Sequence, residues 1–150
     1  MVSAGRALQN APGNPGEAMG EGGMTQSDDA RPPVAVGHVR MDVNDLHSAC
    51  DLLERLGLRP VNRHDTFAVL ELRGGTHLIV RAGEHEIEPG RMAPIDLMVD
   101  DVAETHARYR GMGLDPSEIT SGSIHSSFTI PFTDGYRLKI TSSHTSGRPV

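Results

Sequence analysis

The side chains most able to do chemistry in this chain are eight histidines and one lysine, Lys139, which is set against thirteen arginines. An imidazole ring can ligate a metal ion or transfer a proton, whereas lysine and arginine bind anions. The rest of the composition excludes some partners. A net charge of −6 argues against a nucleic-acid binder, and no apolar run approaches the roughly 18 residues of a membrane span. We therefore expect a small molecule as partner, with no nucleic acid and no membrane.

The first 33 residues contain too few apolar side chains to fold, so they cannot hold the histidines or Lys139 in place. They hold six Gly and four Pro but a single Leu, and so bury too little apolar surface to offset the entropy of folding. We expect 1–33 to be a disordered tail, with Met24 able to serve as a translation start, and 146–150 to be a short second tail. No apolar h-region follows Arg6, so we do not expect a signal peptide in this segment. The single Cys50 indicates a reducing compartment, and we therefore expect a cytoplasmic protein.

The remaining chain repeats itself. Residues 39–60 align with 95–116 without a gap, and the identities fall at positions that shape the backbone. These identities are Val43/Val99, Asp45/Asp101, Gly57/Gly113, Leu58/Leu114 and Pro60/Pro116. The repeat predicts two copies of one structural unit.

Each copy predicts a strand, a helix and three further strands. Alternating apolar and charged residues open each copy as a strand, and Asp45 and Asp101 are suitable N-caps for the helices that follow. Paired strands then flank Gly74-Gly75 and Asp134-Gly135, which predicts β-hairpins. We place the domain at 34–145, with modules 34–81 and 94–145 joined by a linker, 82–93.

The sequence resembles the vicinal oxygen chelate superfamily, which includes glyoxalase I, bleomycin-resistance proteins and extradiol dioxygenases. The resemblance rests on the run from His38 to Leu46, on Leu56-Gly57-Leu58, and on Thr133-Asp134-Gly135-Tyr136 before the last strand. It implies an α+β fold of two βαβββ modules whose mixed sheets curl into a cup that holds the substrate. It also implies a homodimer, with the cup formed either within one chain or between two.

The resemblance further implies four metal-ligand positions, one on the first and last strand of each module. Carried over, they fall on His38, Ile79, Pro94 and Lys139. Only His38 can ligate a metal ion, and catalytic metal sites keep about three protein ligands. We therefore expect no cofactor, although a divalent metal is possible with His38 among its ligands.

Strand alternation assigns a second set of residues to the lining of the cup. Those residues are His38, Arg40, Asp42, His77, Ile79, Arg81, Pro94, Asp96, Met98, Arg137, Lys139 and Thr141. In one interpretation Arg40, Arg137 and Lys139 bind an anion, with His38 as acid or base. In the other, Asp42 and Asp96 pair with these cations in a structural network.

Of the other histidines, His77 could serve as a substitute ligand, because the implied metal-ligand position at Ile79 has no donor atom. We expect the remaining ones to lie outside the site. We expect His106 to pack between helix and sheet and His47 to face solvent. His64, His85, His125 and His144 lie in turns, in the linker or at strand ends. Cys50 is expected to be inert core.

Three functions remain open. The leading one is a glyoxalase- or bleomycin-resistance-like protein that binds a small molecule, with an anion favoured, without a complete metal site. The second is a lyase or dioxygenase-type enzyme that uses His38 as acid or base, or an atypical metal set such as His38, His77 and Asp96. The third is a non-catalytic interaction module.

Overall fold

The computed structural model of the chain describes residues 31–143. The expected start at Met24, the tail 146–150, His144 and all but the last three residues of the expected N-terminal tail lie outside these residues. Residues 31–37 lead into the fold without helix or strand. Within 31–143 no helix is long and apolar enough to cross a membrane.

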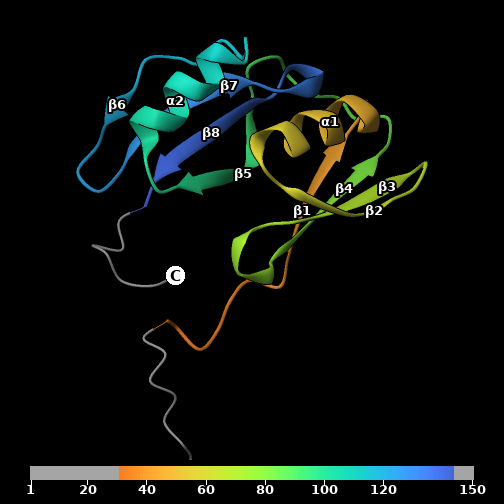
Figure 1. Cartoon of the computed structure of the whole chain (residues 1–150). Helices are drawn as coiled ribbons and strands as arrows, with labels where there is room; N and C mark the ends of the chain where they lie inside the picture. The colour runs from red at the N-terminus through yellow and green to blue at the C-terminus, as the bar shows by residue number, and fades with distance from the viewer. Residues whose placement is uncertain (1–30, 144–150) are drawn as a thin grey trace, which may run out of the picture.

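The described chain forms two modules with the same order of elements (Figure 1). The first comprises β1 (His38–Val43), α1 (Leu46–Leu56), β2 (Arg59–Arg63), β3 (Phe67–Glu71), the 3-10 turn η1 (Arg73–Gly75) and β4 (His77–Ala82). The second comprises β5 (Met92–Val99), α2 (Val102–Gly111), β6 (Thr120–Ser121), β7 (Ser126–Pro131), the 3-10 turn η2 (Thr133–Gly135) and β8 (Arg137–Ser142). This confirms the predicted α+β fold of two βαβββ modules.

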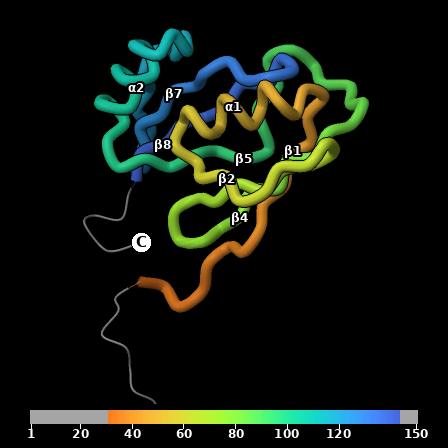
Figure 2. Tube along the Cα trace, turned by 45° about the vertical axis from the view of Figure 1, so that its right-hand side comes forward, coloured from red at the N-terminus to blue at the C-terminus, as the bar shows by residue number. Residues whose placement is uncertain are grey.

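Each module builds one four-stranded mixed sheet. The strand order is β1-β4-β3-β2 in sheet 1 and β5-β8-β7-β6 in sheet 2. In both, the first strand runs parallel to the last, and the hairpin partners are antiparallel. The two sheets stay separate and do not close into a barrel. Figure 2 follows the chain from sheet 1 through the connecting segment into β5, which begins at Met92, inside the linker expected at 82–93.

The helices begin where the sequence predicts them. Asp45 caps α1 by accepting a hydrogen bond from the Ser48 backbone N–H at 2.9 Å, and Asp101 caps α2 through the Glu104 N–H at 2.8 Å. Ser48 donates hydrogen bonds to the Asp45 carboxylate from both its hydroxyl and its backbone N–H. These two bonds hold the pKa of the Asp45 carboxyl below its ordinary value. Gly57 ends α1 with φ of 112°, a left-handed conformation that suits glycine.

Each helix covers one face of its sheet. α1 packs on β3 and β4, and α2 packs on β7 and β8. The alternate strand residues beneath them are buried, as predicted: Met41, Val43, Leu78, Val80, Leu97, Leu138 and Ile140. Three residues that we expected in the same layer, Val39, Ile95 and Val99, are only partly buried. Thr141, expected on the open face, is buried instead, and its hydroxyl donates to the Ser142 carbonyl oxygen.

The modules meet where the C-terminal ends of their helices approach one another. The Tyr109 hydroxyl of α2 donates to the Leu56 carbonyl oxygen at the end of α1, and Arg55 donates to the Met112 carbonyl oxygen. Tyr109 is 1% exposed, and this burial raises the pKa of its phenol, which stays a neutral donor. β1 also lies beside β5 at this junction.

Tyr109 therefore holds the two modules together through both its ring and its hydroxyl. We expect Tyr109→Phe to lower the free energy of unfolding by about 1 kcal/mol, because one hydrogen bond is lost. Tyr109→Ala should cost roughly 3 to 5 kcal/mol, because it also leaves a cavity. Urea unfolding followed by circular dichroism measures both changes. Equal losses for the two variants would contradict this role for the ring.

Candidate functional site

The first group of predicted site residues lies on the helix-free face of sheet 1, the face opposite α1. His38 and His77 occupy matched positions on the parallel strands β1 and β4, and their ring centroids are 5.7 Å apart. His38 is exposed and His77 is half-buried. The two imidazoles are thus neighbours on an open surface, as strand alternation predicted.

The charged residues beside this histidine pair differ in their partners. Arg81 donates to the Asp42 carboxylate at 3.1 Å, so Asp42 does pair with a cation, as the structural interpretation expected. Arg40 forms no hydrogen bond or ion pair through its side chain within residues 31–143. A shallow hollow of about 320 Å³ lies on the same face, between Phe67, Ile79 and His85.

The second group lies on the helix-free face of sheet 2. Asp96 and Lys139 occupy matched positions on β5 and β8. Lys139 is half-buried, yet its ammonium group forms no hydrogen bond or ion pair with any residue of the described part of the chain. Arg137 is already engaged, because its guanidinium donates to the Thr129 hydroxyl at 2.7 and 2.9 Å and to the Thr129 carbonyl oxygen at 3.3 Å.

The single chain does not bring these two groups together. Among residues 31–143 no hydrogen bond or ion pair joins His38, Arg40 or His77 to Asp96, Arg137 or Lys139. No set of three or more His, Cys, Asp or Glu side chains within the same range could hold a metal ion, so the atypical set of His38, His77 and Asp96 is not assembled in one chain. The four positions implied by the resemblance supply one imidazole, two side chains without a donor and an ammonium, which does not fit a divalent ion.

The other histidines are placed largely as predicted. His106 is buried between α2 and the sheet, with its ring edge-on to Phe128 and Nε2 2.8 Å from the Ser117 carbonyl oxygen. His47 is exposed, and its Nδ1 lies 2.9 Å from the Arg63 guanidinium. His125 Nδ1 lies 2.8 Å from the Ser142 carbonyl oxygen. Cys50 is buried, and desolvation raises the pKa of its thiol.

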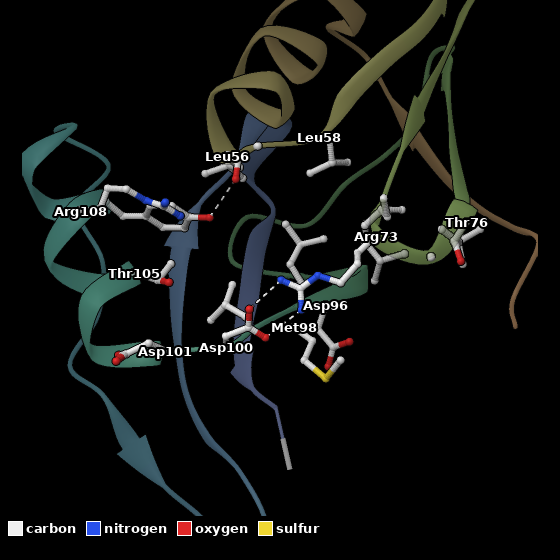
Figure 3. Close-up of a pocket in the computed structure, with 18 of the residues that line it drawn as sticks. Leu56, Leu58, Arg73, Thr76, Asp96, Met98, Asp100, Asp101, Thr105 and Arg108 are labelled. Atoms are coloured by element: carbon white, nitrogen blue, oxygen red, sulfur yellow. Dashed lines mark hydrogen bonds and ion pairs between the residues drawn. The ribbon is translucent and has the colours of Figure 1, made fainter. Parts of the chain in front are cut away.

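A cavity larger than the hollow on sheet 1 was not predicted, and it lies elsewhere. It has a volume of about 880 Å³ and lies between the end of α1, the η1 turn, β5 and α2 (Figure 3). Of the residues predicted to line the cup, Pro94, Asp96 and Met98 line this cavity. Val39, Ile95 and Val99 are among its walls, which explains why they are only partly buried. The sequence carries no local signal for this cavity, because residues from both modules have to meet to form it.

An ion pair between the modules spans this cavity. Arg73 of η1 donates to both oxygens of Asp100, which precedes α2, at 2.8 and 2.9 Å (Figure 3). The two bonds stabilise the ionised carboxylate, so they hold the pKa of Asp100 below its ordinary value. Both side chains are largely exposed, so solvent screens the pair.

Comparisons with known proteins agree with this fold. No family model matches the sequence, and no curated protein matches it. Among solved structures, a lactoylglutathione lyase from Agrobacterium tumefaciens aligns with a TM-score of 0.63 at 15% identity, over 78% of this chain and 99% of its own. A glyoxalase/bleomycin resistance protein/dioxygenase from Alicyclobacillus acidocaldarius gives 0.60 at 17%, over 77% and 96%. The oxidase ChaP-H1 gives 0.58 at 23%, over 76% and 99%.

The architecture is therefore of the glyoxalase-like class, with paired βαβββ modules. The chain has the fold of the vicinal oxygen chelate superfamily, as its sequence motifs indicated.

The ion pair across the cavity leads to a prediction about acid stability. Because the folded-state pKa of Asp100 is depressed, its contribution to stability is present above the ordinary pKa and is lost as the pH falls through the folded value. Arg73→Gln should raise the pKa of Asp100 toward the ordinary value near 3.8. An NMR titration of the Asp100 carboxyl carbon measures this shift. Arg73→Lys, which retains the charge, is the control, and an unchanged pKa in Arg73→Gln would rule out the pairing.

Proposed function

We propose that this protein binds a small anionic molecule on its helix-free faces, without a complete metal site, as glyoxalase/bleomycin-resistance-like binding proteins do. The observation that carries this proposal is Lys139. The Lys139 side chain is half-buried, its ammonium group has no partner within the described residues, and an anion from solution would supply a charge-assisted contact. Asp96, matched to Lys139 on the next strand, lies more than 4.0 Å from it and forms no ion pair with it.

The binding face is proposed to be completed in a homodimer. Arg40 and Lys139 belong to different modules, and within residues 31–143 no hydrogen bond or ion pair joins them. Large apolar side chains are exposed on both faces, with Phe67 at 36% and Met98 at 46%. A second chain that applied its sheet 2 to sheet 1 of the first would cover both side chains and bring the two cations to one ligand.

Binding of simple aromatic anions tests this function. We expect benzoate and phenylphosphonate to raise the Tm of the protein, whereas benzamide and benzylamine, of similar shape, should not. Lys139→Gln and Arg40→Gln should each weaken phenylphosphonate binding about tenfold in calorimetric titration, because each removes one charge-assisted contact. Arg110→Gln, on the outer surface of α2, should bind as the parent does.

Two outcomes would overturn the proposal. One is that the anions and the neutral benzamide shift the Tm equally. The other is that Lys139→Gln binds phenylphosphonate with parental affinity. Sedimentation of the protein tests the dimer separately, and a monomer at all concentrations would remove that part alone.

The His38–His77 pair favours a second candidate, an enzyme of the lyase or oxidoreductase type. In the homodimer arrangement, Asp96 of the second chain would join the two imidazoles and complete an atypical ligand set. Alternatively, His38 would act as acid or base without metal.

Metal analysis separates the two candidates. We expect protein incubated with Zn²⁺ or Ni²⁺ and then desalted to retain well under one equivalent, because too few ligands converge. Retention of one equivalent that is lost in His38→Ala but kept in His106→Ala would favour the enzyme and contradict the leading proposal. Mass spectrometry of the metal content per chain is the measurement.

A further inference from the structure

The cavity between the modules differs from the anion site proposed above, although Asp96 and Met98 of β5 are among its lining residues. Its boundaries are the end of α1, the η1 turn, β5 and α2, and neither Arg40 nor Lys139 contributes to it. Its volume of about 880 Å³ is within the range of small-molecule sites in proteins.

The walls of the cavity are aliphatic. Leu58 from the end of α1, Leu72 beside η1, and Ile95 on β5 supply side chains from both modules. Leu72 and Ile95 are only partly buried. An apolar group placed between these walls would remove more of their surface from water, which favours binding by about 25 cal/mol for each Å² covered.

Charge at the cavity is mostly negative. Four carboxylates, those of Asp96, Asp100, Asp101 and Glu104, face two guanidinium groups. Asp100 is paired with Arg73 and Asp101 caps α2, but the Glu104 carboxylate forms no hydrogen bond or ion pair within residues 31–143. This balance favours a cationic ligand over an anionic one.

A hydroxyl group without a protein partner adds a polar contact to the cavity wall. Thr105 of α2 is 6% exposed, lines the cavity, and lies on its α2 wall (Figure 3). Its hydroxyl makes no hydrogen bond within the described chain. The hydroxyl oxygen keeps some contact with solvent, so a ligand that covers it has to replace that hydration, which a hydrogen-bond donor on the ligand does. An ammonium N–H supplies both the donor and the charge.

We propose that the cavity between the modules binds a small primary amine with an apolar body. The apolar body lies between Leu58, Leu72 and Ile95, and the ammonium group donates to the Thr105 hydroxyl and is attracted by Glu104. The Arg73–Asp100 ion pair lies across the cavity and holds the two modules in place around the ligand.

Titration of the full chain with three eight-carbon probes tests this inference. We expect octylammonium, below its micelle concentration, to bind at least tenfold more tightly than octanoate, because octanoate carries the wrong charge. Octyltrimethylammonium, which has the charge but no N–H donor, should bind less tightly than octylammonium. Calorimetry gives the affinities. Octanoate binding as tightly as octylammonium would overturn the proposal.

Matched variants locate the binding. Thr105→Val, which removes the hydroxyl at constant shape, and Glu104→Gln should each weaken octylammonium binding about fivefold, whereas Thr105→Ser and Glu118→Gln should not. Ile95→Trp, which fills the cavity, should abolish binding, and Lys139→Gln should leave it unchanged. Each variant is checked by its Tm, and Glu104, which is exposed, provides a variant that should fold normally. Parental affinity in both Thr105→Val and Glu104→Gln would refute the site.

Discussion

Within residues 31–143 each sheet has one helix to cover it, and that constraint divides the residues of the strands into two sets. A single helix hides one face, so alternate residues such as Met41, Leu78 and Leu138 pack beneath α1 or α2. The residues between them, including His38 and Lys139, contribute little to the core. The helix-free faces can therefore carry charges that a buried face could not, and the fold tolerates Lys139 at a position where the sequence resemblance implied a metal ligand.

The same constraint produces the cavity between the modules. The two helices touch at their C-terminal ends, where Tyr109 meets the Leu56 carbonyl, and the strands that lie nearest to this contact are not fully covered by either helix. Val39 and Ile95 therefore remain half-exposed, although they belong to the apolar side of their strands. Packing of two small modules in one chain thus creates an apolar space that neither module would have alone.

Much of the fold could be predicted from the sequence because its signals are local or repeated. Asp45 and Gly57 fix the ends of α1, and strand alternation places His38 and His77 on one face. The site was harder to predict because it depends on how the modules meet. Nothing near Thr105 in the sequence indicates that its hydroxyl lies unpaired in a cavity, and Arg73 is paired with Asp100 only because two distant turns come together. Arg137 was predicted as an anion ligand, and nothing in the sequence indicated that its guanidinium donates hydrogen bonds to Thr129 on the neighbouring strand.

The hairpin turn before β8 does more than reverse the chain. Asp134 in η2, at a φ of 59°, reaches into the first module, where its carboxylate accepts hydrogen bonds from the backbone N–H groups of Asn44 at 2.7 Å and Asp45 at 3.4 Å. The start of α1 is thus completed by a residue almost ninety positions later in the sequence. The first module, although made first by the ribosome, lacks this contact until the last hairpin has been synthesised. The two modules are therefore not interchangeable, because the second supplies a hydrogen-bond acceptor to the start of α1 in the first.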